Sequence, residues 1–247
     1  MSEKIEILVT PRKSFPKPSD NMVTIKEPES AAAEAFRILR TNISLRDFDG
    51  KIKVINVISS VTSESKSTTI ANLAYAYSQM EKKVLLIDLD LRASSLHKKL
   101  RLKNNVGVSE VLSNACLFQD AVINYAPNLD VLLAGKKNPY ASELLESKAF
   151  KNFLAAVKDV YDLVLLDCPP VGIVSDGIIV SSMCDGTLLC VASNVVDKKE
   201  LEHTRDLLNN IEGINVLGIV MTRTECSKKY YGSSYGYGYG YGNSKKK

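Results

Sequence analysis

Short blocks of consecutive apolar residues recur along the chain and are separated by longer stretches of mixed polarity. Blocks of this length, bounded by polar residues, are typical of strands whose two faces are both buried. Two of them, KVLLID and DLVLLD, end in an aspartate. We therefore expect six strands, at residues 53–59, 83–88, 129–133, 162–167, 187–192 and 216–221.

The stretches between these blocks contain residues that favour helices. The segment SAAAEAFRILRTNIS, residues 30–44, consists largely of good helix formers, and its apolar residues recur at three- and four-residue spacings. The alternation of strands and helices predicts an α/β fold with a doubly wound, mostly parallel sheet. In such a sheet, ligands bind at the carboxyl ends of the strands. Further helices are predicted at residues 67–80, 142–160, 177–183 and 198–211.

The two ends of the chain differ in composition from the middle. Residues 1–27 are polar and contain three prolines, which predicts an arm that is extended over the domain or loose and lies outside the core. Residues 228–247, KKYYGSSYGYGYGYGNSKKK, have no aliphatic residue, so we expect a disordered tail. Residues 28–227 then form one domain, because 247 residues with 45% hydrophobic content can bury one sizeable core.

Composition excludes several classes of function. A net charge of +4 gives no large positive patch for nucleic acid. The longest apolar runs are far shorter than the roughly 20 residues of a membrane helix, and the polar N-terminus lacks a secretory signal, so a cytosolic protein is expected. The cysteines have no CxxC spacing, which favours buried free thiols over a metal site or disulfides. They are Cys116, Cys168, Cys184, Cys190 and Cys226.

The stretch SSVTSESKSTT, residues 59–69, lies between the first predicted strand and a predicted helix. In such a junction backbone N–H groups can surround a phosphate, while Lys66 reaches the terminal phosphates and Ser67 binds Mg²⁺. Ser63 and Ser65 occupy places where glycine is usual, because the loop requires positive φ. That conformation costs a residue with a Cβ about 1–2 kcal/mol. Taken alone, the stretch more often represents an ordinary polar helix cap.

Aspartates follow two of the predicted strands. Asp88 and Asp90 are two residues apart, which places both on one face of a strand, and Asp167 closes the strand before Pro169. Carboxylates beside a phosphate site can orient Mg²⁺ and accept a proton from an incoming hydroxyl. Taken alone, the pair Asp88 and Asp90 would more often cap a turn. The order of a loop lysine, paired aspartates and a later single aspartate favours a nucleotide site.

With these motifs, the chain resembles the bacterial tyrosine autokinases that control capsule and exopolysaccharide synthesis, in their separate cytoplasmic Gram-positive form. The resemblance runs from about Glu27 to the C-terminus and implies a P-loop NTPase fold of the deviant Walker A, MinD-like type. The motifs that carry it are Glu34-x-x-Arg37-x-x-Arg40 followed by Thr41-Asn42, a modified Walker A at 59–68, a Walker A′ at 86–92, a Walker B at 164–167 followed by Pro169-Pro170-Val171, Asp176, and a terminal tyrosine cluster.

The resemblance implies ATP and Mg²⁺ as cofactors and assigns residues to them. Asp88, Asp90, Lys66 and Asp167 would be catalytic, with Asp88 activating the tyrosine hydroxyl, and Ser67, Asp88 and Asp167 would bind the metal. Glu34, Arg37 and Arg40 would contact the next subunit of a ring, although their spacing alone fits a solvated helix face. The residues expected to bind ATP are Ser63, Glu64, Ser65, Lys66, Ser67 and Thr68.

The tyrosines of the C-terminal segment are the expected phosphoacceptors. A flexible segment of about 25 residues reaches roughly 25–30 Å, enough to enter an adjacent subunit. The alternative is a Tyr/Gly segment that only binds or aggregates. The resemblance also implies a membrane adaptor of the polysaccharide co-polymerase type, whose cytoplasmic tail completes the ATP site, and a cognate tyrosine phosphatase. The tyrosines are Tyr230, Tyr231, Tyr235, Tyr237, Tyr239 and Tyr241.

Two other functions remain compatible with the motifs. A partitioning-type ATPase would have the same Walker elements but would require a lysine near the start of the loop, where this chain has Val61. A scaffold or pseudokinase could retain the fold after losing the loop glycines. The chain also departs from the family at Ser94, where proline is usual, and at Thr222, where asparagine is common near the base.

Overall fold

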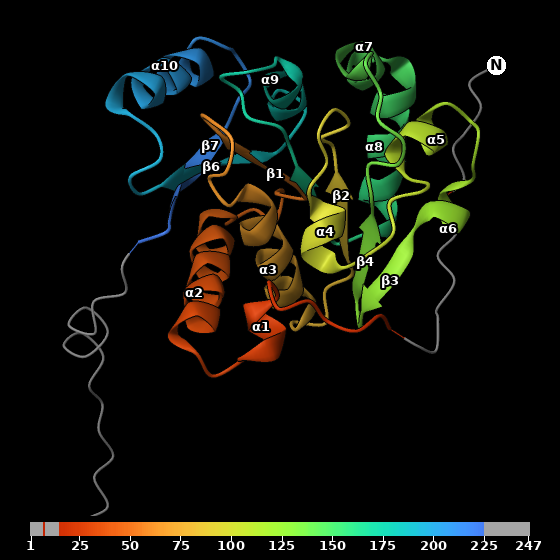
Figure 1. Cartoon of the computed structure of the whole chain (residues 1–247), viewed down its shortest axis with the longest axis horizontal. Helices are drawn as coiled ribbons and strands as arrows, with labels where there is room; N and C mark the ends of the chain where they lie inside the picture. The colour runs from red at the N-terminus through yellow and green to blue at the C-terminus, as the bar shows by residue number, and fades with distance from the viewer. Residues whose placement is uncertain (1–6, 8–14, 225–247) are drawn as a thin grey trace, which may run out of the picture.

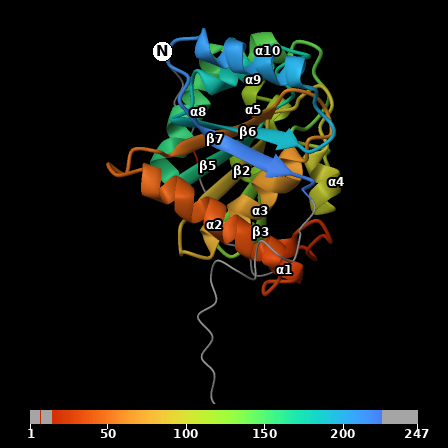
Figure 2. The same ribbon diagram turned by 90° about the vertical axis from the view of Figure 1, so that its left-hand side faces the viewer.

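A seven-stranded sheet lies between two layers of helices in the computed structural model, which describes residue 7 and residues 15–224 (Figures 1 and 2). The strand order is β3-β4-β2-β5-β1-β6-β7. Every pair is parallel except β3 with β4, so the predicted doubly wound, mostly parallel fold is confirmed. The strands are β1 Val54–Ser59, β2 Val84–Asp88, β3 Ile123–Ala126, β4 Leu129–Leu132, β5 Leu163–Asp167, β6 Gly186–Ala192 and β7 Val216–Thr222.

The helices cover both faces of this sheet. On one face α3 packs against the central strands with α1, α2 and α4 beside it, and α5 to α10 lie on the other face (Figure 1). The helices are α1 Val23–Lys26, α2 Ala31–Arg46, α3 Lys66–Ser78, α4 Leu96–Leu100, α5 Val108–Leu112, α6 Phe118–Ala121, α7 Ala141–Glu146, α8 Lys148–Val160, α9 Asp176–Ser181 and α10 Lys198–Asn209.

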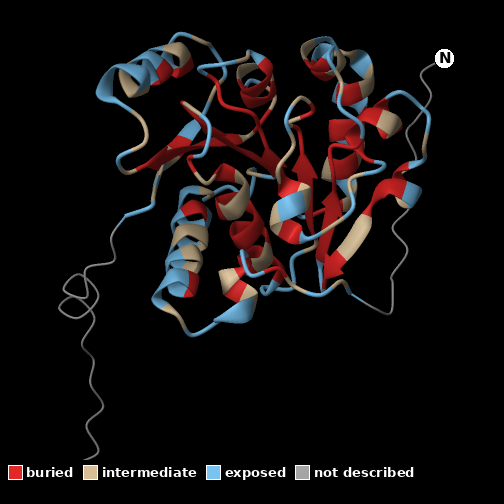
Figure 3. Ribbon diagram, viewed as in Figure 1, coloured by how far each residue is buried: buried red, intermediate tan, exposed pale blue. Residues whose placement is uncertain are grey.

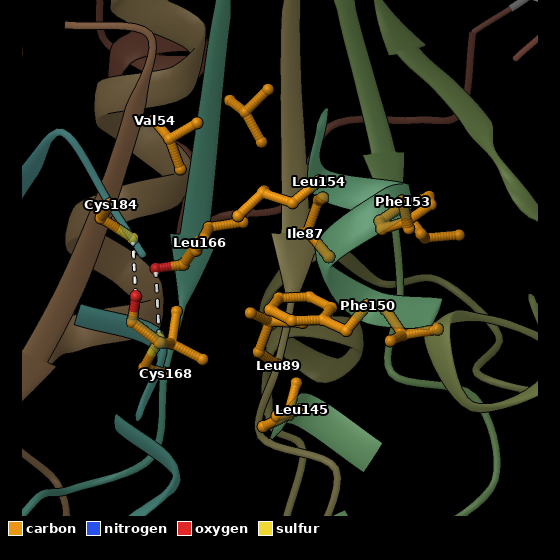
Figure 4. Packing of buried hydrophobic residues seen from close by; sticks show 14 of the residues in the cluster. Val54, Ile87, Leu89, Leu145, Phe150, Phe153, Leu154, Leu166, Cys168 and Cys184 are labelled. Carbon is orange, nitrogen blue, oxygen red and sulfur yellow. Dashed lines mark hydrogen bonds between the residues drawn. The ribbon is translucent and has the colours of Figure 1, made fainter. Parts of the chain in front are cut away.

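Each face of the sheet has its own apolar cluster, because successive side chains of a strand point to opposite sides. In β1, Val54 and Ile58 belong to one cluster, and Ile55 and Val57 belong to the other. The first cluster packs against Phe150 of α8 (Figure 4). Because helices cover both faces, the central strands are buried throughout (Figure 3). This explains why their sequences are continuous apolar blocks.

One amide interrupts the apolar character of β1. Asn56 is completely buried. It donates a hydrogen bond to Ser181 Oγ of α9 at 2.7 Å and accepts one from Thr187 Oγ1 of β6 at 2.7 Å. Its polar atoms are therefore satisfied within the core, by two different neighbouring elements.

The structure has two helices, α7 and α8, where the sequence predicted one helix at 142–160. The break between them is at Ser147. This residue has an extended backbone, with φ −64° and ψ 156°, which ends α7. Its hydroxyl accepts a hydrogen bond from the Phe150 N–H at 3.2 Å, so the same residue caps the start of α8. The antiparallel strand β3 was also missed, because its four residues, INYA, are too few and too mixed in polarity to show a period.

The N-terminal segment contributes to the core from Ser19 onward, so the expectation that residues 1–27 lie outside it is wrong for this part. Met22 is only 1% exposed and packs in the cluster on the α3 side. Thr24 donates from its N–H and its hydroxyl to Asn72 Oδ1 of α3, at 3.1 and 2.9 Å. The segment thus satisfies an amide that is itself completely buried.

The cysteines are free thiols wherever the structure describes them. Cys168, Cys184 and Cys190 are buried, as predicted, and Cys116 is partly exposed. Burial raises the pKa of Cys190 to about 12, so this thiol is unreactive near neutral pH. Cys226 lies outside the described residues. Within residues 15–224, no helix is both long enough and apolar enough to span a membrane.

Candidate functional site

The candidate site lies where β1, β5 and β2 end side by side. Asp88 of β2 pairs in register with Asp167 of β5, and Asp167 pairs with Val57 of β1. The two aspartates that end these apolar blocks therefore lie at the carboxyl edge of the sheet, where ligands bind in folds of this kind. A cavity of about 310 Å³ opens at this edge. We call the loop between β1 and α3, residues 60–65, the phosphate loop. Its residues 62–65 line the cavity, together with Lys66, Asp90 and Asp167.

The phosphate loop has the backbone of an anion site although it lacks glycine. Ser63 and Ser65 have φ values of 63° and 65°, the left-handed conformation that the sequence predicted for them. The thirteen-residue helix α3 begins immediately afterwards, at Lys66. Its N-terminus is therefore directed at the cavity, where unpaired N–H groups and the helix dipole favour a phosphate.

Lys66 lies across the base of the loop. Its ammonium group donates to Ser59 Oγ at 2.8 Å, and the Ser59 hydroxyl donates to the Val61 carbonyl at 2.6 Å. The lysine is only 9% exposed but contributes to the cavity wall. Its positive charge is thus held beside the place where phosphates would bind.

Glu64 belongs to the cavity wall, but its side chain is directed into the protein, so it would contact ATP only through its backbone. The residue is completely buried. Its carboxylate accepts hydrogen bonds from the Val61 N–H at 2.9 Å and from the Ala192 N–H, at the end of β6, at 3.0 Å. Its carbonyl accepts from the Thr222 hydroxyl at 3.0 Å. The residue fastens the loop to the sheet, a role for which its polarity alone gave no indication.

Asp88 and Asp167 form a pair of buried carboxylates, 0% and 2% exposed. Burial, and then repulsion from Asp167, raise the pKa of Asp88. Burial also raises the pKa of Asp167, although the nearby Ser67 hydroxyl and the charge of Lys66 oppose this. Within the described part of the chain, Asp167 Oδ1 has no hydrogen-bond partner. A buried, unpartnered carboxylate oxygen beside a second carboxylate suits a hard cation such as Mg²⁺.

Asp88 and Asp90 do not share a strand face, so that prediction is wrong. The strand ends at Asp88, and Asp90 lies in the following loop, residues 89–95, which we call the aspartate loop. The Asp90 side chain caps this turn, accepting from the Ala93 N–H at 2.8 Å, and it lines the cavity. Asp88 instead accepts from the Asp90 N–H at 3.1 Å and from the Ser94 hydroxyl at 2.6 Å. Ser94 also lies 3.0 Å from His97 Nδ1.

Arg92 ties the aspartate loop to two other segments. Its guanidinium donates to both oxygens of Asp176, at 2.8 and 3.3 Å, and Asp176 is completely buried at the start of α9. It also donates to Ser142 Oγ, in α7, at 2.9 Å and to the carbonyl of Pro139, which precedes α7, at 3.0 Å. Arg92 and Asp176 were visible as parts of motifs. Ser142 was missed, because a serine in a helical segment gives no signal of this kind.

The three residues predicted for a subunit contact lie on α2. Arg37 and Glu34 form an ion pair with each other at 2.6 Å, and both remain more than one-third exposed. Arg40 donates to the Ala76 carbonyl of α3 at 2.8 Å. The predicted phosphoacceptors, residues 230–241, lie outside the described residues.

Comparison with known proteins identifies the family. Residues 52–215 match the family model described as an AAA domain. The tyrosine-protein kinase YwqD of Bacillus subtilis is 36% identical over 218 residues, which cover 86% of this chain and 92% of that protein. The chain belongs to the bacterial tyrosine-protein kinases. A second member of this family, the putative tyrosine-protein kinase CapB of Staphylococcus aureus, is 32% identical over 83% of this chain and 92% of that protein.

Solved structures agree with the family assignment. The crystal structure of the chimerical protein CapA2B2 has a TM-score of 0.80 and 33% identity, over 85% of this chain and 92% of that one. The septum site-determining protein MinD of Pyrococcus horikoshii, complexed with Mg-ADP, has a TM-score of 0.56 and 22% identity, over 72% of each chain. The second likeness shows the fold alone. The tyrosine kinase family is therefore favoured over the partitioning-type ATPases, as the motifs suggested.

Proposed function

We propose that this chain is an ATP-dependent protein-tyrosine kinase that phosphorylates the tyrosines of residues 228–247 in a neighbouring copy of itself. Through this reaction it regulates the synthesis and export of capsular polysaccharide or exopolysaccharide. The observation that carries the proposal is the edge where the phosphate loop and Lys66 meet the paired Asp88 and Asp167, in a chain 36% identical to the tyrosine-protein kinase YwqD. The phosphate loop, Lys66 and the aspartates line or underlie a single cavity.

The residues at the cavity fit Mg-ATP. The backbone N–H groups of residues 63–68 and the Lys66 ammonium would hold the phosphates. Ser67, Asp88 and Asp167 would hold Mg²⁺, and the unpartnered Oδ1 of Asp167 supports this assignment. Bound magnesium would neutralise charge on the phosphates of ATP. The remaining requirements are to position the tyrosine and to remove its proton.

The reaction exchanges one phosphorus–oxygen bond for another. The tyrosine oxygen forms a bond to the γ-phosphorus, the bond from that phosphorus to the β-phosphate oxygen breaks, and ADP leaves. We assign Asp88 as the group that takes the tyrosine proton, with Asp90 beside it on the cavity wall. In this assignment the Ser94 hydroxyl turns away from Asp88 when the substrate binds, since catalytic hydrogen bonds commonly rearrange in the substrate complex.

The two aspartates can be separated by experiment. Asp88→Asn and Asp90→Asn are each expected to keep the fold, because the amide replaces the carboxylate without a change of size. Asp88→Asn should reduce the rate of phosphorylation by at least about a hundredfold, and Asp90→Asn by less. If only the Asp90 variant lost activity, the carboxylate that lines the cavity would be the base.

The proposed partners follow from the same function. A ring of copies, in contact through Glu34, Arg37 and Arg40, would bring the tyrosines of one copy to the site of the next. A cytoplasmic tail of a membrane adaptor would complete the ATP site and hold the kinase at the membrane. A groove of about 520 Å³ between α2 and β7 supports this, because it reaches Ser65 of the phosphate loop and Thr68 in the first turn of α3. A tyrosine phosphatase would reverse the modification.

Intact-mass analysis after incubation with Mg-ATP tests the proposed function. The wild-type chain should gain several phosphoryl groups, in larger yield with an adaptor segment present. A variant with all six C-terminal tyrosines changed to phenylalanine is the matched control, because it leaves the catalytic residues intact. It should gain none, yet it should phosphorylate a second chain that carries the tyrosines and the substitution Lys66→Met. If the mass of the wild-type chain does not change with Mg-ATP, either with or without the adaptor segment, the kinase function is contradicted and the scaffold function is favoured.

A further inference from the structure

Glu64 is a charged side chain that is completely buried in a loop without glycine. Its Oε2 accepts from the Val61 N–H at 2.9 Å, and its Oε1 accepts from the Ala192 N–H at 3.0 Å. Hydrogen bonds from backbone N–H groups to a carboxylate are stronger than those between neutral groups. The side chain therefore joins the start of the phosphate loop firmly to the end of β6.

The main chain of Glu64 is also attached to the sheet. The hydroxyl of Thr222, the last residue of β7, donates to the Glu64 carbonyl at 3.0 Å. Strands β6 and β7 are hydrogen-bonded neighbours, with Ala192 and Thr222 in register. The three bonds thus anchor Glu64 to two paired strand ends, which are rigid compared with a loop.

The residues on either side of Glu64 are the two that glycine would normally occupy. Ser63 and Ser65 have φ values of 63° and 65°, and a residue with a Cβ leaves this conformation when nothing holds it there. We propose that Glu64 is a positioning residue, whose hydrogen bonds hold Ser63 and Ser65 in the positive-φ conformation that glycine would adopt without support. By fixing the peptide units between Ser63 and Ser65, it keeps the N–H groups of the loop directed at a phosphate. The inference rests on the proposed function, because the phosphates are those of the nucleotide.

The geometry requires a carboxylate at this position. Both partners of the Glu64 side chain are N–H donors, so both side-chain atoms that face them must be acceptors. Glu64→Gln preserves the size of the side chain but turns an NH₂ group toward one of these donors, which loses one hydrogen bond and leaves that N–H buried without a partner. Glu81→Gln is a matched control. Glu81 is exposed, has a positive φ of 58°, and lines no part of the cavity.

The affinity for Mg-ADP, measured by calorimetry, tests the proposal without any need for catalysis. Glu64→Gln should bind about tenfold more weakly than wild type, as expected for one buried hydrogen bond, and Glu81→Gln should bind like wild type. The same two substitutions are then made in a Ser63→Gly/Ser65→Gly background. Glycine adopts positive φ without support, so the loss caused by Glu64→Gln should shrink to about threefold or less there.

Two results would overturn the proposal: equal affinity of Glu64→Gln and wild type, or an equal loss in the serine and glycine backgrounds. Circular dichroism reports whether Glu64→Gln folds. If it does not, Thr222→Val removes the hydroxyl bond at the edge strand, and it should weaken Mg-ADP binding about threefold. Unchanged affinity in that variant would also overturn the proposal. Absence of Mg-ADP binding by the wild-type chain would instead contradict the proposed function.

Discussion

The phosphate loop and the aspartate loop contribute to the same cavity but are held in shape in different ways. The phosphate loop contains two residues in the left-handed conformation, and it is fixed by bonds from Glu64 to backbone N–H groups. The aspartate loop has bonds of this kind too, from the Asp90 and Ala93 N–H groups to carboxylates. It is held in addition by bonds between side chains, from Ser94 to Asp88 and from Arg92 to Asp176, which the carboxylate of Glu64 does not make in the phosphate loop.

This difference suggests a division of work between the loops. Backbone N–H groups are the part of the phosphate loop that would contact a nucleotide, so its shape should determine nucleotide affinity. The aspartate loop carries Asp90 and covers Asp88, so its side-chain bonds should determine how fast the phosphoryl group is transferred. Variants in each loop can test whether affinity and rate separate in this way.

The largest effect is expected for Lys66→Met, which removes the positive charge at the cavity that both loops help to form. Because a lysine at this position contributes charge to the phosphates rather than packing, phosphorylation should fall by at least about a hundredfold while the fold is retained. Phosphotyrosine formation and the thermal unfolding midpoint measure the two quantities. If this variant formed as much phosphotyrosine as the wild-type chain, Lys66 and the phosphate loop would have no part in the reaction.

An intermediate effect is expected for Asp176→Asn, which weakens the attachment of Arg92. Weakening the bonds between the Arg92 guanidinium and the buried Asp176 side chain should lower the turnover rate about tenfold, with Mg-ADP affinity nearly unchanged. The exposed pair Arg205 and Asp206 on α10 provides the control, since Asp206→Asn disrupts an ion pair far from the cavity and should change neither quantity. An Asp176→Asn variant that lost affinity as much as rate would show that the loops are not independent.

The smallest effect is expected for Ser63→Gly combined with Ser65→Gly. Glycine relieves the backbone strain of the phosphate loop, so Mg-ADP affinity should rise about threefold. The gain is modest because the loop already has its binding conformation. Calorimetry measures the affinity, and a weaker affinity in the double variant would mean that the serines contribute contacts of their own.

Much of the fold was predictable because burial on both faces leaves a plain pattern in the sequence. The six apolar blocks all became strands, and the aspartates that end two of them lie in register, as Asp88 and Asp167. The left-handed conformations of Ser63 and Ser65 were also predictable, since the strand–loop–helix geometry imposes positive φ whichever residue is present. These features depend on local sequence and on general rules for sheets.

The features that escaped prediction depend on contacts between distant parts of the chain. The partner of the Glu64 carboxylate at Ala192 lies 128 residues further on, so neither the position nor the direction of that bond can be read from the loop. The hydrogen bond from the Ser94 hydroxyl to Asp88 depends on the backbone conformation of the aspartate loop. Helix α8 starts at Lys148 because Ser147 happens to cap it, and a single serine is too common to signal a break.

The amide of Asn56 in the middle of β1 has a consequence for which fold the chain adopts. If β1 slipped by one residue against its neighbours, Asn56 would turn to the face where Ile55 and Val57 now pack, and it would lose both Ser181 and Thr187. An amide buried without partners costs about 2–7 kcal/mol, a large part of the total stability of a domain. Asn56 thus disfavours sheets in which β1 pairs out of register with β5 and β6, and so keeps the phosphate loop, which follows β1, beside the end of β5.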